Sequence, residues 1–239
     1  MKNQAEGDVI IALDFPDAQA VYGFLDQFQD EKPFVKVGME LFYAEGPRIV
    51  REIKARGHSI FLDLKLHDIP NTVKGAMGSL ARLDIDMTNL HAAGTVDMMR
   101  AAMEGLTRPD GRRPMLLAVT QLTSTSEERM QRELLIHAGM AGTVVHYARN
   151  AKEAGLDGVV CSPHEAALVK GACGGNFLTV TPGIRFAGSA EDDQARVMTP
   201  RKARLGGSDF IVVGRPVTRA KDPVGTYRRC KKEFLEVGW

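Results

Sequence analysis

Short runs of β-branched and other apolar residues recur along the chain, and each run predicts a β-strand. Eight such runs occur, at residues 9–13, 34–37, 59–64, 87–90, 115–119, 158–160, 177–180 and 210–213. The segments between them are long enough for a helix, and several, such as 71–83 and 141–154, carry Ala, Met and Leu at three- and four-residue spacings. Strands that are apolar on both faces and separated by helical crossovers predict a parallel sheet.

Eight strand–helix units in 239 residues match the size of a (β/α)8 TIM barrel, which is the α/β fold class we expect. The alternative is an open doubly wound sheet. The first strand is followed by Asp14-Phe-Pro-Asp17, however, with no GxGxxG turn, and no Walker-type GxxxxGK[ST] motif occurs. Because no linker or shift in composition divides the chain, we expect residues 1–239 to form one catalytic domain.

The overall composition excludes several kinds of partner. The chain has 31 Lys and Arg against 30 Asp and Glu, a balance that argues against a strongly basic nucleic-acid surface. No apolar run approaches the roughly 20 residues that span a bilayer, and residues 1–8 are too polar for a signal peptide. Cys161, Cys173 and Cys230 lack CxxC spacing and are typical of reduced thiols. We therefore expect a cytoplasmic protein that binds neither nucleic acid nor a membrane.

Polar residues stand at or just beyond the end of most predicted strands, where the active sites of barrels lie. They are Asp14, Lys36, Asp63, Lys65, Asp68, His91, Gln121, Thr123, Ser162, Arg185 and Arg215. Two long polar connections, 120–133 and 181–200, follow strand ends as well and are typical of loops that cover a ligand.

Three of these charges are expected to face the barrel interior together. Asp63 and Lys65 are two residues apart on a strand and so share one face, while the neighbouring leucines take the other. Lys36 points inward if its flanking valines pack against the helices. Alternating Lys and Asp can keep one another charged in a partly dry space. A lysine in that setting could deliver a proton to a developing carbanion, although a structural ion pair that fills the barrel is an open alternative.

A second constellation predicts a site for phosphate. The eighth strand ends in Gly214 and Arg215 just before a predicted helix, and in barrels the loops after the seventh and eighth strands often hold phosphate. Arg215 would provide two parallel N–H donors, with Arg185 and Gln194 from the preceding loop as further donors. A turn with a solvated arginine is the alternative.

The histidines and the polar segment 120–126 point to a specific chemical role less clearly than the two groups above. His67, His91 and His164 lie near strand ends, but no HxH or HxxxH pair occurs, so hydrogen bonding is favoured over metal binding. The segment 120–126 could contact the polar edge of a planar ring, or it could cap the helix that contains Glu127 and Glu128. We expect neither a metal nor a nucleotide cofactor.

These motifs resemble the bacterial type of the orotidine 5′-phosphate decarboxylase family. The strongest match is Phe61-Leu-Asp-Leu-Lys-Leu-His-Asp-Ile-Pro70, which carries the family's Asp-x-Lys-x-x-Asp signature. Matches at 12–14, 35–38, 91–94, 122–124, 180–185 and 213–215 extend over nearly the whole chain. The shorter Asp-x-Lys-x-x-Asp core also occurs in metal-dependent phosphosugar lyases of the same barrel group, so the flanking matches make the resemblance specific.

The resemblance implies the decarboxylation of orotidine 5′-monophosphate to uridine 5′-monophosphate, with no cofactor. Lys65 would protonate C6 of the pyrimidine as carbon dioxide leaves, beside Asp63, with Lys36 and Asp68 completing a charged network. It also implies a homodimer with shared sites, in which Asp68 acts in the neighbouring subunit. The expected substrate contacts are Asp14 and Lys36 to a ribose hydroxyl, Thr72 to the partner's ribose, Thr123 to the pyrimidine, and Arg185, Gln194, Gly214 and Arg215 to the phosphate. The alternatives are a metal-dependent phosphosugar lyase and a non-enzymatic barrel that binds a phosphorylated ligand.

Overall fold

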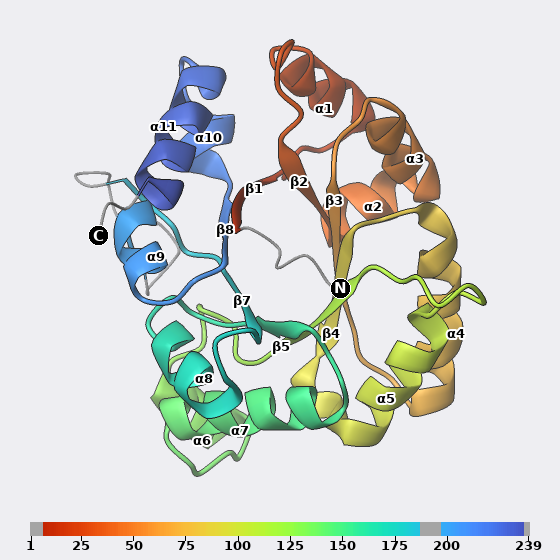
Figure 1. Ribbon diagram of the computed structural model, residues 1–239, viewed down its shortest axis with the longest axis vertical. Helices are drawn as coiled ribbons and strands as arrows, with labels where there is room; N and C mark the ends of the chain where they lie inside the picture. The colour runs from red at the N-terminus through yellow and green to blue at the C-terminus, as the bar shows by residue number, and fades with distance from the viewer. Residues whose placement is uncertain (1–6, 187–196, 237–239) are drawn as a thin grey trace.

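The computed structural model describes residues 7–186 and 197–236, and its strands close into a barrel (Figure 1). All neighbouring strands are parallel and follow chain order, and the last strand pairs with the first. The expected fold class is therefore confirmed, and the open-sheet alternative is wrong because that final pairing leaves no sheet edge. The strands are β1 (Asp8–Ala12), β2 (Phe34–Gly38), β3 (Ile60–Leu66), β4 (Met87–His91), β5 (Met115–Val119), β6 (Gly158–Val160), β7 (Leu178–Thr181) and β8 (Phe210–Val213).

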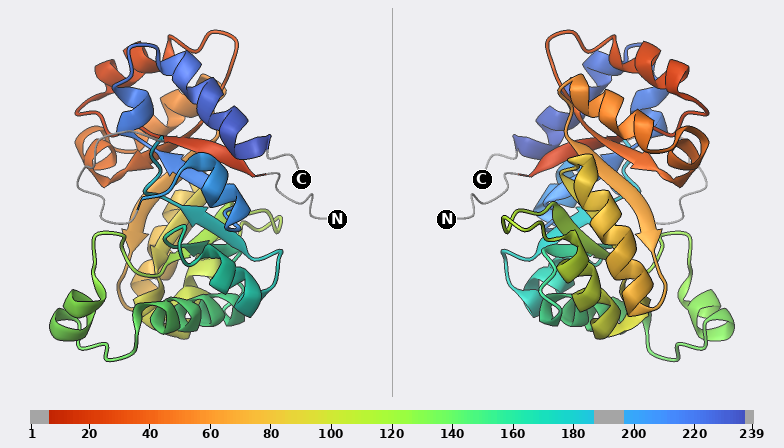
Figure 2. Two further views of the ribbon diagram at one scale, coloured as in Figure 1. Left: turned by 90° about the vertical axis from the view of Figure 1, so that its left-hand side faces the viewer. Right: turned by 90° about the vertical axis from the view of Figure 1, so that its right-hand side faces the viewer.

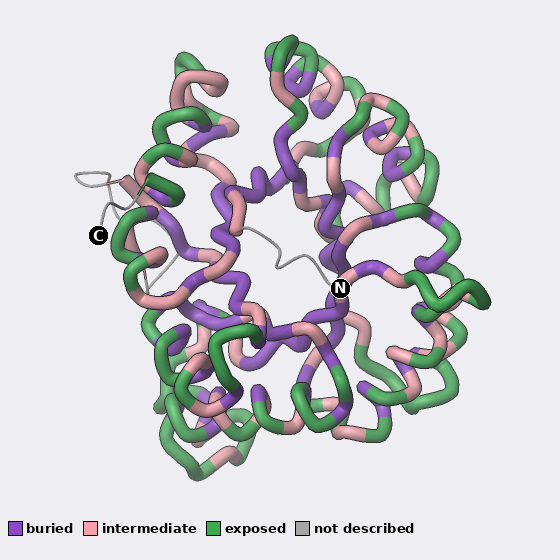
Figure 3. The backbone as a smooth tube through the Cα atoms, in the orientation of Figure 1, coloured by how far each residue is buried: buried purple, intermediate pink, exposed green. Residues whose placement is uncertain are grey.

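The helices surround the strands and carry their exposed residues on the outside, whereas the strands are mostly buried (Figure 3). The predicted helix at 71–83 is α4 followed by a short 3-10 turn, and the one at 141–154 is α7. No helix in the described ranges is long and apolar enough to cross a membrane. The α-helices are α1 (Ala18–Leu25), α2 (Met39–Glu45), α3 (Pro47–Ala55), α4 (Pro70–Leu80), α5 (Thr95–Leu106), α6 (Glu127–Glu133), α7 (Met140–Glu153), α8 (Ala166–Cys173), α9 (Pro200–Leu205), α10 (Arg215–Thr218) and α11 (Pro223–Leu235); the 3-10 turns are η1 (Ala81–Leu83) and η2 (Ala92–Gly94).

Successive side chains of each strand point to opposite faces, so the buried side chains form two separate cores. The outer core, between the barrel and the helices, contains Val35, Val37 and Leu62. The inner core fills the barrel and contains Phe34 and Phe61. Residues at the intervening positions of β2 and β3 therefore project into the barrel, because successive side chains of a strand point to opposite faces.

Aspartates tie neighbouring strands together at the amino ends of the barrel strands. Each one directly precedes an even-numbered strand, accepts a hydrogen bond from a backbone N–H at the start of the preceding strand, and pairs with a basic side chain. We call these three groups the basal clamps: Asp86 with Ile60 and Lys54, Asp157 with Leu116 and Arg113, and Asp209 with Thr179 and Lys170. They order the end of the barrel that lies away from the expected site.

The two long connections differ in structure. The first contains α6, which stands away from the rest of the molecule (Figure 2). Ser126 accepts a hydrogen bond from the Arg129 amide and caps this helix, which confirms the capping interpretation for that residue. In the second, Ile184 forms a parallel bridge with Met198. Residues 187–196 between them lie outside the described residues.

Helices α4 and α5 pack in direct backbone contact through Gly105. A Cβ atom at this position would lie 2.1 Å from the Lys74 carbonyl oxygen, so the helices would have to separate. We expect Gly105→Ala to lower the free energy of unfolding by about 2 kcal/mol, because overpacking outweighs the gain in helix propensity. Urea unfolding followed by circular dichroism measures this change. The control is Gly75→Ala in α4, where nothing lies within 4 Å of the added Cβ; an equal loss in both variants would contradict the packing argument.

Candidate active site

A cluster of four charged side chains lies at the carboxyl ends of β1, β2 and β3, which we call the mouth of the barrel. Lys65 Nζ is 2.7 Å from Asp63 Oδ1, and Lys36 Nζ is 3.4 Å from Asp63 Oδ2 and 3.3 Å from Asp14 Oδ1. The predicted inward orientation of Lys36, Asp63 and Lys65 is confirmed. The four residues form one chain of opposite charges, referred to below as the Lys–Asp cluster.

Asp63 is the central member of this cluster and is 8% exposed. Burial alone would raise the pKa of its carboxyl group, but the ammonium groups of Lys36 and Lys65 and hydrogen bonds from Lys65 and Asn89 hold the pKa below its ordinary value. Asp63 is therefore ionised at neutral pH. Both of its oxygens face cations, which leaves the mouth with two ammonium groups and a fixed carboxylate between them.

The backbone of β3 is irregular where it carries this cluster. Lys65 has a φ of 52°, in the left-handed region that residues with a Cβ rarely adopt. Pairing with β4 shifts at the same place, since Leu62 pairs with Thr88 and Leu66 pairs with Leu90. An advance of four residues along β3 therefore corresponds to an advance of two residues along β4. The extra residues of β3 form a bulge, which takes Lys65 out of the regular backbone pairing.

Asn89 is a site residue that the sequence argument did not single out. It is 1% exposed, donates from Nδ2 to Asp63 Oδ1 at 2.7 Å, and accepts from the Lys65 backbone N–H at 2.9 Å. Asn89 lies two residues before His91, and residues two apart on a strand share one face. An inward-facing His91 therefore implies an inward-facing Asn89, and this spacing was the signal in the sequence. The bulge that brings Lys65 to it has no comparable signature in the sequence.

His67 and His91 lie together beside the cluster, with ring centroids 5.7 Å apart. Burial lowers the pKa of His91, and the nearby His67 and Lys65 lower it further, so its imidazole is neutral at pH 7. Within residues 7–186 and 197–236, no group of three or more His, Cys, Asp or Glu side chains is arranged to hold a metal ion.

Asp68 and Thr72 are exposed on the segment that follows β3. The Asp68 carboxylate accepts a hydrogen bond from the Ile69 amide at 2.6 Å, and it forms no ion pair with the described part of the same chain. The single chain therefore does not bring Asp68 into the Lys–Asp cluster.

The residues expected to bind phosphate lie at the ends of β7 and β8. Gly214 ends the connection from β8, and Arg215 is the first residue of α10. A Cβ at Gly214 would lie 3.6 Å from Asp14 Oδ2, so the end of β8 adjoins the Lys–Asp cluster. Arg185 is half-buried and donates to the Ile184 carbonyl oxygen at 2.9 Å. Gln194 lies outside the described residues.

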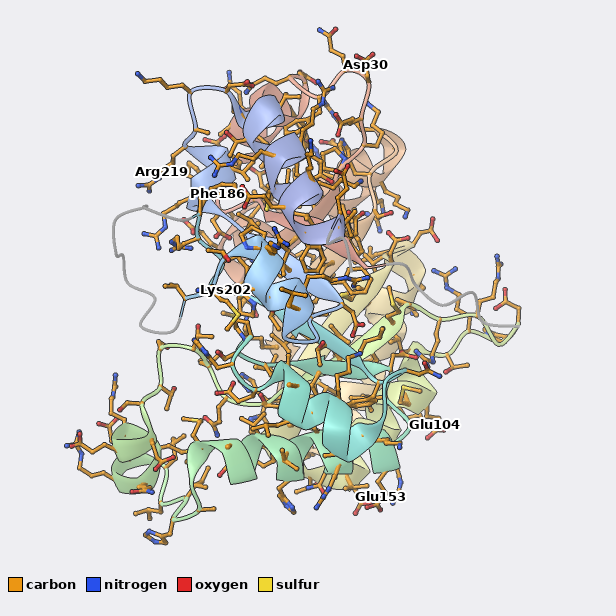
Figure 4. The ribbon with its side chains drawn as sticks, turned by 60° about the vertical axis from the view of Figure 1, so that its left-hand side comes forward. Asp30, Glu104, Glu153, Phe186, Lys202 and Arg219 are labelled. Carbon is orange, nitrogen blue, oxygen red and sulfur yellow. The ribbon has the colours of Figure 1, made fainter. Side chains whose placement is uncertain are left out.

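Phe186 fixes the start of the second long connection against α11. The guanidinium of Arg229 lies 4.6 Å from the centre of its ring. Figure 4 shows Phe186 on the same side of the molecule as Arg219, beside α10 and α11. Because Phe186 directly follows Arg185, this contact anchors the chain next to Arg185 on α11.

Two further candidates from the sequence, Thr123 and Ser162, are buried in loops that follow strands. Thr123 is 8% exposed and lies in the connection between β5 and α6, before the helix that Ser126 caps. Ser162 is fully buried, and its amide donates to Glu165 in a tight turn. We conclude that Ser162 is structural.

The fold and the site define a (β/α)8 barrel enzyme whose mouth carries paired lysine and aspartate side chains beside an arginine at the end of β8. Sequence comparison identifies the family. The profile of the orotidine 5′-phosphate decarboxylase / HUMPS family matches residues 7–230, and the chain belongs to this family.

Individual relatives agree with this assignment. The chain is 59% identical over 226 residues to orotidine 5′-phosphate decarboxylase of Streptococcus mutans, covering 94% of this chain and 96% of the relative. It is 60% identical over 228 residues to the protein of the same name from Bacillus caldolyticus, covering 94% and 93%. The crystal structure of orotidine 5′-phosphate decarboxylase from Lactobacillus acidophilus matches with a TM-score of 0.85 at 43% identity, covering 95% of this chain and 99% of that one.

Proposed function

We propose that the chain decarboxylates orotidine 5′-monophosphate with Lys65 as the proton donor. The activity is that of a carboxy-lyase that forms uridine 5′-monophosphate and carbon dioxide. The observation that carries the proposed mechanism is the Lys36–Asp63–Lys65 chain of contacts at the barrel mouth. It places an ammonium group beside a buried carboxylate in a partly dry space.

In the proposed reaction, the bond between C6 and the carboxylate carbon breaks and its electron pair stays on C6. Carbon dioxide leaves, and the Lys65 ammonium stabilises the carbanion and then transfers a proton to C6. The neutral amine regains its proton from solvent. Since the negative charge on the ring carbon exists only after the bond begins to break, an ammonium beside that carbon lowers the barrier.

Asp63 would hold Lys65 in place for this transfer. The 2.7 Å contact between Asp63 Oδ1 and Lys65 Nζ fixes the ammonium, and Lys36 balances the remaining charge on Asp63. This role requires an ionised Asp63, and its lowered pKa keeps the carboxyl group ionised at neutral pH.

The nucleotide would lie across the mouth from the Lys–Asp cluster to Arg215. Asp14 and Lys36 would bind a ribose hydroxyl, and Thr123 would contact the pyrimidine. Gly214, Arg215, Arg185 and Gln194 would bind the phosphate. The closeness of Gly214 to Asp14 supports this path, because ribose and 5′-phosphate are adjacent parts of the substrate.

A direct assay tests the activity and its independence of metal. The absorbance change of orotidine 5′-monophosphate is followed before and after exhaustive treatment with EDTA. We expect equal rates. Equal rates would exclude a metal-dependent phosphosugar lyase as the main role. Loss of activity that added Mg²⁺ restores would contradict cofactor-independent decarboxylation, and no turnover in either condition would contradict the proposed activity itself.

We further propose that the enzyme is a cytoplasmic homodimer in which Asp68 and Thr72 reach the partner's site. Ile69, between them, is an apolar residue that is 67% exposed in the single chain, and a partner subunit would cover it. The three buried free thiols support a reducing compartment.

Mixing two inactive variants tests the shared site. We expect Asp68→Ala and Lys65→Ala subunits to regain activity when mixed under conditions of subunit exchange. A hybrid dimer contains one site that has Lys65 from one chain and Asp68 from the other, and it therefore has one intact site. The initial rate before and after mixing measures this. No recovery, when exchange is verified with tagged subunits, would show that Asp68 does not act across the interface.

A further inference from the structure

The backbone of Lys65 is strained, and regular hydrogen bonding between β3 and β4 does not hold it in place. Its φ of 52° and the shift in pairing between β3 and β4 interrupt the backbone ladder over Asp63, Leu64 and Lys65. Strained conformations of this kind persist only where surrounding contacts hold them. Side chains of β4 provide these contacts.

Two consecutive residues of β4 bond to β3 from opposite faces of the sheet, one just before the bulge and one within it. Thr88 Oγ1 donates to the Leu62 carbonyl oxygen at 2.9 Å, before the bulge and toward the helices. Asn89 accepts from the Lys65 backbone N–H at 2.9 Å, inside the barrel. Both residues are fully or almost fully buried, so water does not compete for these bonds.

Asn89 differs from Thr88 because it also bonds to the Lys–Asp cluster. Its Nδ2 donates to Asp63 Oδ1, the same oxygen that receives the Lys65 ammonium. One amide group therefore fixes the backbone of Lys65 and the carboxylate to which the Lys65 side chain is bonded. An aspartate at this position could accept from Lys65 but would repel Asp63, whereas a side-chain amide supplies the acceptor and the donor on two separate atoms without charge.

We propose that Asn89 is a positioning residue, which sets where the Lys65 ammonium stands relative to the reacting carbon. This inference rests on the proposed role of Lys65 and adds to it a residue that does not touch the substrate. Displacement of a reacting group by about 1 Å can cost about 10²-fold in rate. Loss of Asn89 should therefore act on kcat and leave the phosphate end of the site intact.

The test compares Asn89→Ala with Thr88→Val in the full-length enzyme. Each variant loses a buried side-chain hydrogen bond between β3 and β4, but only the first loses a contact to Asp63. We expect Asn89→Ala to lower kcat by about 10²-fold while the Kd for uridine 5′-monophosphate changes by less than about threefold. Thr88→Val should lower Tm but keep kcat within about threefold.

The pH dependence of kcat/KM separates a positioning role from a structural one, because loss of stability alone would not change it. The Asn89 hydrogen bond lowers the pKa of Asp63, so its removal should shift the acid limb of kcat/KM to higher pH. Thr88→Val should leave the limb in place. The other titratable groups around Asp63 are the same in both variants: Asp14, Lys36, Lys65, His67 and His91.

Several outcomes would overturn the inference. One is a folded Asn89→Ala enzyme with kcat within threefold of wild type, and another is an equal loss of kcat in Thr88→Val. If Asn89→Ala does not fold, Asn89→Ser, whose hydroxyl is too short to reach both partners, is measured under the same criteria. An inactive wild-type enzyme would refute the proposed function itself, whereas an active wild type with unaffected variants would refute only the role of Asn89.

Discussion

Lys65→Ala is expected to reduce kcat by about 10⁴-fold or more. The substitution removes both the proposed proton donor and the cation proposed to stabilise the carbanion. Proton transfer by a positioned group is worth about 10² to 10⁴-fold, and one charge-stabilising donor is worth about 10² to 10³-fold. Asp63 keeps its contacts to Lys36 and Asn89, so the fold should persist. Single-turnover decarboxylation of orotidine 5′-monophosphate measures the loss, and the Kd for uridine 5′-monophosphate measures retained binding.

A second lysine–aspartate pair gives the matched control. Lys54 Nζ lies 2.7 Å from Asp86 Oδ2 in a basal clamp, the same distance that separates Lys65 from Asp63, but at the opposite end of the barrel. Lys54→Ala should lower Tm and leave kcat unchanged. If Lys65→Ala retained kcat within tenfold of wild type, Lys65 could not be the proton donor.

Arg215→Ala is expected to lower kcat/KM for orotidine 5′-monophosphate by about 10²-fold. The loss corresponds to about 3 kcal/mol, the upper range for a hydrogen bond to a charged group. The effect should vanish with orotidine, the nucleoside that lacks the phosphate, because Arg215 then has no ligand group to bind. Steady-state kinetics with both substrates measure the difference.

Arg219→Ala controls for the loss of positive charge in the same region. Arg219 is exposed, and its backbone N–H bonds to the Arg215 carbonyl oxygen one turn earlier. We expect this variant to stay within about threefold of wild type with either substrate. Equal losses for the nucleotide and the nucleoside in Arg215→Ala would contradict the phosphate assignment.

Strand periodicity was sufficient to predict the fold and the inward face of the charged cluster. Val35 and Val37 pack outside the barrel, which forces Lys36 inside, and the leucines around Asp63 and Lys65 do the same for that pair. Such alternation depends only on local backbone geometry, so it can be deduced from residue order. The eight strands occur within two residues of their predicted bounds for the same reason.

The features that sequence could not supply depend on contacts between distant segments. Lys65 adopts a left-handed conformation because Asn89 and the bulge hold it there, and no local pattern around Lys65 requires this. The role of Asp68 in a neighbouring subunit is a prediction from family resemblance, and Asp68 is exposed in the single chain.

The basal clamps separate the sources of rigidity and reactivity in this enzyme. Each clamp joins an odd-numbered strand to the next even-numbered one at the amino ends, while the Lys–Asp cluster occupies the carboxyl ends. Residues that resist unfolding and residues that react are thus different sets, a full strand length apart. Heat tolerance could therefore be engineered at the base of the barrel without a change at the mouth.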